Sequence, residues 1–240
     1  MDIPTLQSSP RKHIVAMGGG GWGMEPNNPL LDFYVYNLLD KSEPKVCFLP
    51  TASGDSEKYV SRFYEHFAPQ PACLSHLSLF EPPTSDLENL IFEQDIIYVG
   101  GGNTKNLIAL WKEWQLDRIL QKAWEKGIIL CGVSAGSICW FQQGVTDSIP
   151  GQKTALDCLG FLAGSNCPHY NWDVYREGYH QLLLQGAIAN GYATDDGVAL
   201  HFTGDELSNI VSSRPNAMAY FMENSHGKIK ETPLKPKYLG

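Results

Sequence analysis

An alternation of short apolar runs with stretches of helical periodicity between residues 13 and 141 constrains the fold more than any other feature. Such runs are typical of parallel strands buried on both faces, and the amphipathic stretches between them are typical of crossover helices. The predicted strands are 13–17, 45–49, 72–77, 95–99 and 128–131. The pattern therefore predicts an α/β fold with a mainly parallel sheet and helices on both of its faces.

The segments between these runs carry helix signals. Ser56 is a suitable N-cap, and Gly127 is a suitable residue to follow a helix end. Apolar side chains recur at helical spacing in two of the segments. These side chains are Tyr59, Phe63 and Phe67 in one segment, and Leu107, Leu110, Trp111 and Trp114 in another. Helices are accordingly expected over 30–39, after Ser56, around residue 110 and from residue 116 onward.

The pattern changes after Gly144. Short strand-like runs at 198–202, 207–211 and 217–222 are separated by turn residues. They predict an antiparallel C-terminal extension that continues the same sheet or packs on its edge. Because no repeat, low-complexity segment or linker separates the two halves, residues 13–240 are expected to form a single domain after a polar tail over 1–12.

Charge and hydropathy exclude several classes of partner. The chain has 26 acidic and 18 basic residues, for a net charge of −8, and no basic cluster that would bind nucleic acid or anionic lipid. No apolar run approaches the roughly 20 residues that span a bilayer, and no secretory signal is visible, so a cytoplasmic location is expected.

Six cysteines are present, but none forms a CxxC pair, and three of them lie within the apolar runs. Reduced, buried thiols are therefore expected in place of disulfides or a zinc site. Because no cluster of His, Cys and Asp has the spacing of metal ligands, no metal is expected either.

A candidate nucleophile lies in the pentapeptide Gly132-Val133-Ser134-Ala135-Gly136, which follows the predicted strand 128–131 and precedes a helix-like segment. A sharp turn from strand to helix raises a serine hydroxyl above the sheet, and small neighbours let the backbone pass closely on both sides. Ser134 therefore suits nucleophilic attack. The pentapeptide also fits a plain turn with a capping serine, so further residues are needed to decide.

Two further segments supply partners for such a serine. Gly101 and Gly102 follow the predicted strand 95–99 and reach the same C-terminal sheet edge, where their amides and that of Ala135 are candidates for an oxyanion hole. The next residue, Asn103, also suits the N-cap of a helix. His169 lies in a short loop after a proline, which restricts the backbone as a general base requires.

The runs VGGGNT, GVSAG, TDS and CPHY together resemble the peptidase E family, which is serine peptidase family S51 and includes the cyanophycinases. The resemblance covers nearly the whole chain and weakens toward the C-terminus. It implies a flavodoxin-like three-layer sandwich, related to class I glutamine amidotransferases, and a triad of Ser, His and Asp or Glu. In this sequence Ser134 would be the nucleophile and His169 the base, with Gly101, Gly102 and Ala135 as oxyanion donors.

The acid of the triad is ambiguous in this comparison. The family's acidic position aligns with Asp147, or with Ser148 if Pro150 is matched instead. We favour Asp147 because a carboxylate stabilises an imidazolium by charge and a serine does not. Asp157 and Asp173 remain alternatives.

The family also implies the substrate class. Members related to peptidase E favour an N-terminal aspartyl residue, and cyanophycinases cut β-aspartyl-arginine units. The expected function is hydrolysis of small peptides, aspartyl peptides among them, through an acyl-enzyme and without a cofactor. Asn103, Tyr170 and Arg176 are the expected substrate contacts, and the planar guanidinium of Arg176 suits a carboxylate. Arg176 equally fits an exposed partner of nearby acidic residues, and the oligomeric state stays open.

Three other functions compete with a serine peptidase. The glycine-rich run 18–23 satisfies GxGxxG after the first predicted strand, but Pro50 and Thr51 stand where a dinucleotide site needs an acidic residue. An α/β-hydrolase esterase shares the GxSxG turn and would draw its base from His201 or His226. An amidotransferase-like binding module would keep the fold without a reactive serine.

Overall fold

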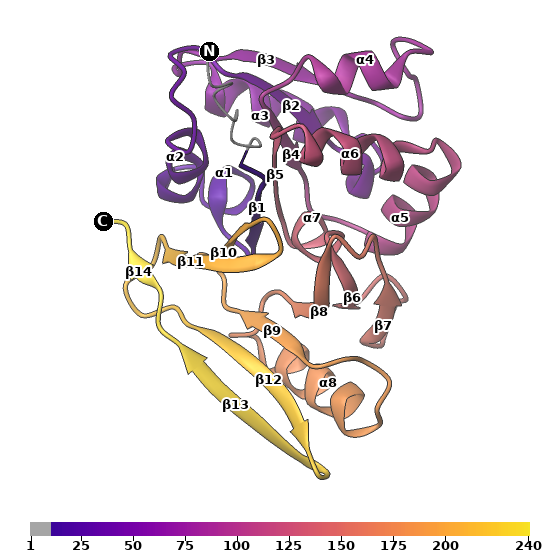
Figure 1. Ribbon diagram of the computed structural model, residues 1–240, viewed down its shortest axis with the longest axis vertical. Helices are drawn as coiled ribbons and strands as arrows, with labels where there is room; N and C mark the ends of the chain where they lie inside the picture. The colour runs from indigo at the N-terminus through magenta and orange to yellow at the C-terminus, as the bar shows by residue number, and fades with distance from the viewer. Residues whose placement is uncertain (1–10) are drawn as a thin grey trace, which may run out of the picture.

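The computed structural model describes residues 11–240, which form an eight-stranded and a six-stranded sheet (Figure 1). The larger sheet has the strand order β14-β11-β10-β1-β5-β4-β2-β3. Its parallel strands are β1 (His13–Met17), β2 (Lys45–Leu49), β3 (Cys73–His76), β4 (Ile96–Val99) and β5 (Ile129–Val133). The α/β class is confirmed, and each of these strands lies within two residues of its predicted range.

The C-terminal extension is partly as expected. β10 (Val198–Thr203) pairs antiparallel with β1, β11 (Glu206–Ser212) pairs antiparallel with β10, and the short β14 (Lys237–Tyr238) pairs parallel with β11. These strands continue the large sheet. The expected tail over 1–12 falls almost entirely outside the described residues.

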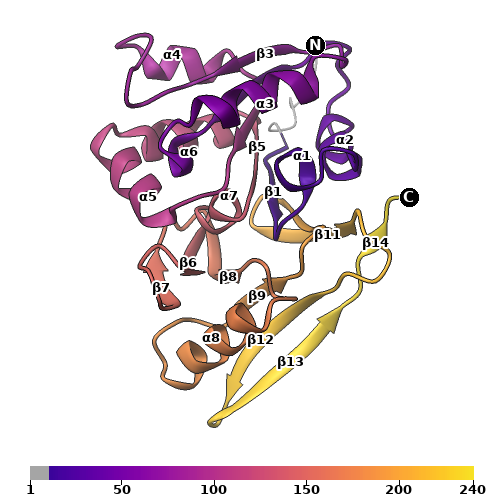
Figure 2. The same ribbon diagram turned by 180° about the vertical axis from the view of Figure 1, so that it is seen from behind.

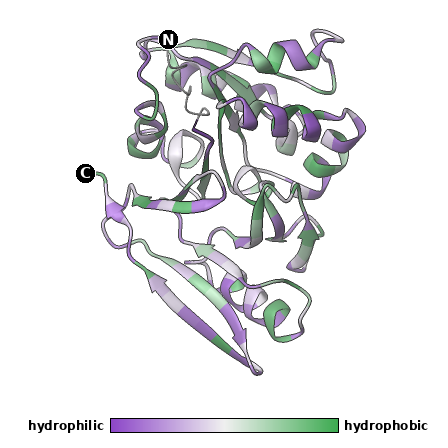
Figure 3. Ribbon diagram, in the orientation of Figure 1, coloured by the Kyte–Doolittle hydropathy of each residue, from purple (hydrophilic) through white to green (hydrophobic). Residues whose placement is uncertain are grey.

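The helices cover both faces of the large sheet because strand side chains alternate between two cores. In β1, Ile14 and Ala16 pack with α4 (Leu87–Phe92), α5 (Thr104–Glu113) and α6 (Leu116–Glu125). Val15 and Met17 pack with α1 (Gly21–Met24), α2 (Leu30–Tyr36) and α3 (Glu57–Phe67). Figures 1 and 2, which view the molecule from opposite sides, show α3 and α6 on opposite faces. The apolar colours of Figure 3 concentrate in the central strands between them.

The second sheet was not predicted. It has the order β13-β12-β9-β8-β6-β7 and mixes parallel and antiparallel pairs. Its strands are β6 (Phe141–Thr146), β7 (Thr154–Asp157), β8 (Leu162–Cys167), β9 (Gly191–Thr194), β12 (Ala219–Ser225) and β13 (Lys228–Leu234). The predicted runs 198–202 and 207–211 thus continue the large sheet as expected, whereas the run 217–222 forms most of β12 in the second sheet. Strands such as FQQGVT and LAGSNC are too polar to stand out as buried runs.

A third core lies between this sheet and α8 (Asp173–Leu184), where Tyr175, Tyr179 and Leu183 face Val145, Met222 and their neighbours. Two short elements complete the chain, the 3₁₀ turn η1 (Thr51–Ser53) and α7 (Ala135–Ile138). Within residues 11–240, no helix is long and apolar enough to cross a membrane.

The cysteines are all free in the structure, but their burial differs from the prediction at two positions. Cys47, Cys131, Cys139 and Cys167 are buried, whereas Cys158 is partly buried and Cys73 is exposed. Cys73 begins β3 at the edge of the large sheet, where one side of the strand has no neighbour to cover it.

Candidate active site

The backbone at Ser134 forms the sharp turn that the pentapeptide predicts. Ser134 lies between β5 and α7 with φ 57° and ψ −110°, a strained conformation for a residue with a side chain. The flanking glycines are required by space: a Cβ on Gly136 would lie 2.3 Å from the carbonyl oxygen of Val99, and one on Gly132 would lie 2.6 Å from that of Gly136. The turn therefore holds the hydroxyl at the C-terminal edge of the large sheet.

His169 approaches this hydroxyl from the second sheet. It follows β8, has a φ of 54°, and donates its backbone N–H to the carbonyl of Gly18 at 3.2 Å. Its side-chain Nε2 lies 2.9 Å from Ser134 Oγ. The loop after β8 and the turn after β5 thus bring together two residues that are 35 positions apart in the chain.

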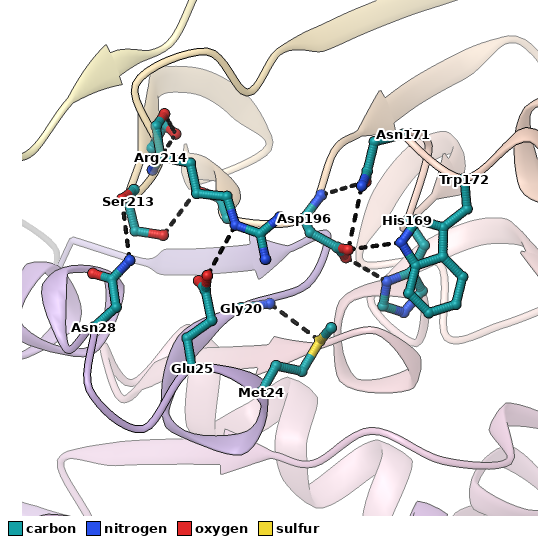
Figure 4. A network of polar contacts seen from close by, with 12 residues as sticks. Gly20, Met24, Glu25, Asn28, His169, Asn171, Trp172, Asp196, Ser213 and Arg214 are labelled. Carbon is teal, nitrogen blue, oxygen red and sulfur yellow. Dashed lines mark hydrogen bonds and ion pairs between the residues drawn. The ribbon is translucent and has the colours of Figure 1, made fainter.

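The other ring nitrogen of His169 faces the carboxylate of Asp196, in the loop between β9 and β10 (Figure 4). Nδ1 lies 2.6 Å from Asp196 Oδ1, and both side chains are largely buried. Burial alone would raise the pKa of Asp196, but His169 and hydrogen bonds from Asn171 and Trp172 outweigh it and hold the pKa below its ordinary value. The ionised carboxylate accepts a hydrogen bond from Nδ1–H, which leaves the unprotonated Nε2 free to accept a hydrogen bond from the hydroxyl of Ser134.

The prediction of Asp147 as the acid is therefore wrong: the structure places Asp196, and not Asp147, beside His169. Its Oδ2 accepts a hydrogen bond from Tyr175 at 2.8 Å and pairs with Lys153 at 3.3 Å, away from the imidazole. The alternatives do not reach His169 either: Asp157 accepts from Gln143 on the second sheet, and Asp173 begins α8. The pKa of Asp147 lies below its ordinary value because Tyr175 and Lys153 outweigh the raising effect of burial.

The sequence contains a signal for Asp196. Asp195, Asp196 and Gly197 follow β9 directly, which places two carboxylates at the C-terminal end of a strand beside the strand that leads to His169. The predicted strand at 198–202 begins just after them. Without knowledge of the second sheet, however, nothing in the chain relates this turn to the loop after β8.

The glycine-rich run 18–23 supports the site and does not resemble a dinucleotide loop. A Cβ on Gly19 would lie 1.9 Å from Asp196 Oδ1 and 3.1 Å from His169 Nδ1, so the backbone there closes directly over the pair. The rest of the run enters the short α1, and Arg214 Nε pairs with Glu25 Oε1 at 2.9 Å just beyond it (Figure 4).

The three candidate oxyanion donors differ in how they lie relative to Ser134. A Cβ on Gly101 would lie 3.4 Å from Ser134 Cβ, so this backbone faces the nucleophile, and its N–H makes only a long 3.4 Å contact to Tyr59. Ala135 is the first residue of α7, where a helix leaves its N–H groups unpaired. Gly102 instead packs against η1, where a Cβ would lie 2.2 Å from the carbonyl oxygen of Ala52.

The three expected substrate contacts are engaged by the protein itself. Asn103 caps α5 by accepting from the N–H of Asn106 at 2.9 Å, and it donates to the carbonyl of Ser148 at 3.1 Å. Tyr170 is only 1% exposed, which contradicts its assignment as a substrate contact. Arg176 forms an ion pair with Glu231 on β13 and covers the Tyr170 ring.

The positions of His201 and His226 bear on the esterase alternative, and the arrangement of the His, Cys, Asp and Glu side chains bears on metal binding. His201 of β10 hydrogen-bonds to His13 of β1 and to Tyr34 of α2, and His226 lies in the turn between β12 and β13, so neither is the base that an esterase arrangement would need. Across residues 11–240, no group of three or more His, Cys, Asp or Glu side chains is arranged to hold a metal ion.

Comparisons with known proteins find relatives that are named as peptidases. The chain is 54% identical over 230 residues to the uncharacterised peptidase YgaJ of Bacillus subtilis, covering 95% of this chain and all of that protein. It is 26% identical over 223 residues to peptidase E of Shewanella denitrificans, covering 87% and 90% of the two chains.

Two solved structures share the fold. A peptidase from an acI-B1 actinobacterium superposes with a TM-score of 0.71 at 16% identity, covering 95% of this chain and 96% of the other. A putative peptidase E of Listeria monocytogenes superposes with a TM-score of 0.61 at 20% identity, covering 85% and 98%. The sequence profile of peptidase family S51 matches residues 14–210. Because this match spans most of the sequence, the chain belongs to peptidase family S51.

Proposed function

We propose that this peptidase is a serine hydrolase that cleaves small peptides through an acyl-enzyme on Ser134. The observation that carries the proposal is the unbroken chain of hydrogen bonds from Ser134 Oγ to His169 Nε2, at 2.9 Å, and from His169 Nδ1 to Asp196 Oδ1, at 2.6 Å. A serine, a base and an orienting carboxylate in this order are the functional unit of serine hydrolases on many folds.

In the first half of the reaction, Ser134 Oγ attacks the carbonyl carbon of the peptide bond while His169 Nε2 takes the hydroxyl proton. Asp196 stabilises the imidazolium that forms and keeps the ring in the required tautomer. The amides of Gly101 and Ala135 are the candidate donors for the oxyanion of the tetrahedral intermediate.

In the second half, the imidazolium gives its proton to the leaving amine, which departs and leaves an ester on Ser134. Water then attacks this ester with His169 again acting as base, and the acid product leaves with the free serine restored. Every proton in both steps passes through His169 Nε2, so no further titratable group is required.

The nucleophile and the acid are tested by a fluorophosphonate, which forms a covalent adduct only with an activated serine. We expect the adduct on Ser134 and none in Ser134→Ala. Asp196→Asn should slow the reaction by about 10⁴-fold, because an amide stabilises the wrong tautomer of His169, whereas Asp147→Asn should leave the rate close to that of the wild type. Mass spectrometry maps the adduct, and far-ultraviolet circular dichroism checks each fold.

An inert Ser134 in a folded protein that still binds peptides would instead support the non-catalytic module. A large loss in Asp147→Asn with a normal rate in Asp196→Asn would return the acid to the residue that the sequence favoured.

The proposed aspartyl substrate class rests on the family resemblance and on Arg176. An aspartyl preference needs a cation for the substrate carboxylate, and the predicted Arg176 is held by Glu231 and by the Tyr170 ring. Asp-Leu, Leu-Leu and β-Asp-Arg should therefore be compared in wild type and Arg176→Met. A role in binding predicts that the variant loses activity on the two aspartyl substrates alone. Equal relative rates on all three would leave Arg176 as a structural partner of β13.

A further inference from the structure

Asp196 is held by more than the histidine that it orients. Its Oδ2 accepts the indole Nε1–H of Trp172 at 2.9 Å and the side-chain amide of Asn171 at 3.4 Å. The Oδ1 of Asn171 in turn accepts the backbone N–H of Asp196 at 2.8 Å (Figure 4). One asparagine thus fixes both the backbone and the carboxylate of the same residue.

Trp172 contacts the base as well as the acid. Its ring lies 5.0 Å from the His169 ring at an interplanar angle of 31°, while Tyr175 packs on the same histidine at 5.3 Å. Trp172 is nevertheless 46% exposed. A large apolar ring at the surface gains little from burial, so its contacts with His169 and Asp196 are the interactions that account for its position.

His169, Asn171 and Trp172 belong to one turn. The N–H of Trp172 donates to the carbonyl of His169 at 2.9 Å, and α8 begins directly after Trp172. The turn that presents the imidazole to Ser134 therefore also carries both donors that hold the carboxylate behind that imidazole. A carboxylate bonded only through Oδ1 would be free to rotate about its Cβ–Cγ bond.

We propose that Asn171 and Trp172 are positioning residues that lock the Asp196 carboxylate against His169. This inference rests on the proposed serine mechanism, in which only a fixed carboxylate keeps the proton on Nδ1 and stabilises the imidazolium. The indole also excludes water from one face of the His169–Asp196 bond, which strengthens the interaction between the two groups.

Trp172→Phe and Asn171→Asp separate this role from packing. The first variant keeps an aromatic ring over His169 and removes only the donor. The second is nearly isosteric and keeps the acceptor for the N–H of Asp196, but it replaces the amide donor with a second carboxylate. Trp114→Phe is the matched control, because Trp114 is also a partly exposed tryptophan and is the C-cap of α5, whose N-terminal end is the one that begins beside the Gly101 loop.

The rate of fluorophosphonate labelling of Ser134 should fall about tenfold in Trp172→Phe, which is the typical loss for one hydrogen bond to a charged group. It should fall further in Asn171→Asp, where two carboxylates face each other. The rate of Trp114→Phe should match that of the wild type. Wild-type rates in both positioning variants would overturn the proposal.

The pH profile distinguishes positioning from a general loss of packing. The charged and titratable groups around Asp196 are His169 and Tyr175 on one side, Asp195 beside it in the chain, and Arg214 across a shared cavity of about 390 Å³. Removing a donor from the carboxylate raises the pKa of Asp196, because the hydrogen bonds from Asn171 and Trp172 are among the causes that lower it. The acidic limb of the labelling rate should therefore move to higher pH in both variants, and an unchanged limb would argue against positioning.

An NMR measurement that does not depend on activity distinguishes a failure of the positioning proposal from a failure of the proposed serine mechanism. In the NMR spectrum of ¹⁵N-labelled protein, the indole N–H signal of Trp172 is assigned as the one that is absent from Trp172→Phe. This signal should lie downfield in the wild type and move upfield in Asp196→Asn, because a neutral amide is a weaker acceptor. If the wild type failed to label at all, the serine mechanism would fail while this signal still reported the contact. An indole signal unaffected by Asp196→Asn would refute the contact itself.

Discussion

At position 19, glycine leaves the space that the Asp196 carboxylate needs to reach the imidazole of His169. The residue has no unusual φ, so its glycine is required only because a Cβ would lie 1.9 Å from Asp196 Oδ1. Gly19→Ala must displace the carboxylate, and we expect fluorophosphonate labelling of Ser134 to slow by about 10²-fold or more, the loss typical of a misplaced catalytic group. The protein should remain folded, as judged by its thermal melt.

Gly204→Ala is the control for this substitution. Gly204 lies in the β10–β11 turn with open space around it and a φ of 64°, so alanine there should cost roughly 1 kcal/mol of stability without touching the triad. A normal labelling rate in Gly19→Ala would mean that the loop yields without moving Asp196.

The residues of the site differ in how far the sequence alone could predict them. Ser134 and His169 lie in local motifs, the strand–turn–helix pentapeptide and the loop after a proline, and the structure places them in contact. Asp196 has no such motif, because its role depends on β9 lying beside β8. The contacts of Tyr170 and Arg176 could not be predicted for the same reason: their partner Glu231 comes from β13, which no local pattern relates to the loop after β8.

At the scale of elements, the parallel strands were predictable because each is an apolar run bounded by turn residues. The second sheet was not, since its strands gain their burial from α8 and from each other. Helix α8 carries polar and apolar side chains in nearly equal measure, and this weakens its helical stripe. Its contacts with the β12–β13 hairpin therefore depend partly on charge.

The contact between α8 and β13 should make stability depend on pH. Glu231 accepts from Tyr170 and pairs with Arg176 and His180. Burial would raise its pKa from the ordinary 4.5, but these partners outweigh burial and lower it. A lowered folded-state pKa adds stability above the unfolded-state pKa, and that stability is lost as pH falls through the folded-state value.

Glu231→Gln tests this dependence. Its melting temperature should lie about 2–4 °C below that of the wild type at pH 7, the shift expected for roughly 1 kcal/mol in a domain of this size. The difference should begin to shrink as the pH falls below 4.5 and should be smallest below the lowered folded-state pKa, where the wild-type carboxylate is also neutral. Glu223→Gln removes an exposed pair with Lys230 on the same hairpin and should change the melt little. A difference that is the same at every pH would exclude the ion pair as its cause.

At the scale of the whole molecule, the triad joins the two sheets. Ser134 follows β5 of the large sheet, whereas His169 and Asp196 follow β8 and β9 of the second. The 2.9 Å contact between Ser134 and His169 therefore depends on how the sheets are held together. An aromatic cluster lies at this junction: Phe202 of β10 packs at 5.7 Å on Phe141 of β6 and at 5.8 Å on Tyr192 of β9.

Phe202→Leu should loosen this junction without emptying it. We expect a loss of about 1–2 kcal/mol in the free energy of unfolding, typical of a core substitution that removes ring contacts. Phe63→Leu is the matched control, because Phe63 is equally buried but packs between α3 and the far side of the large sheet. Both variants should be similarly destabilised in urea, yet only Phe202→Leu should slow the labelling of Ser134 at a temperature where both remain folded. Equal labelling rates would show that the site tolerates movement between the sheets, and the loops around Gly19 and His169 would then be sufficient to hold the triad.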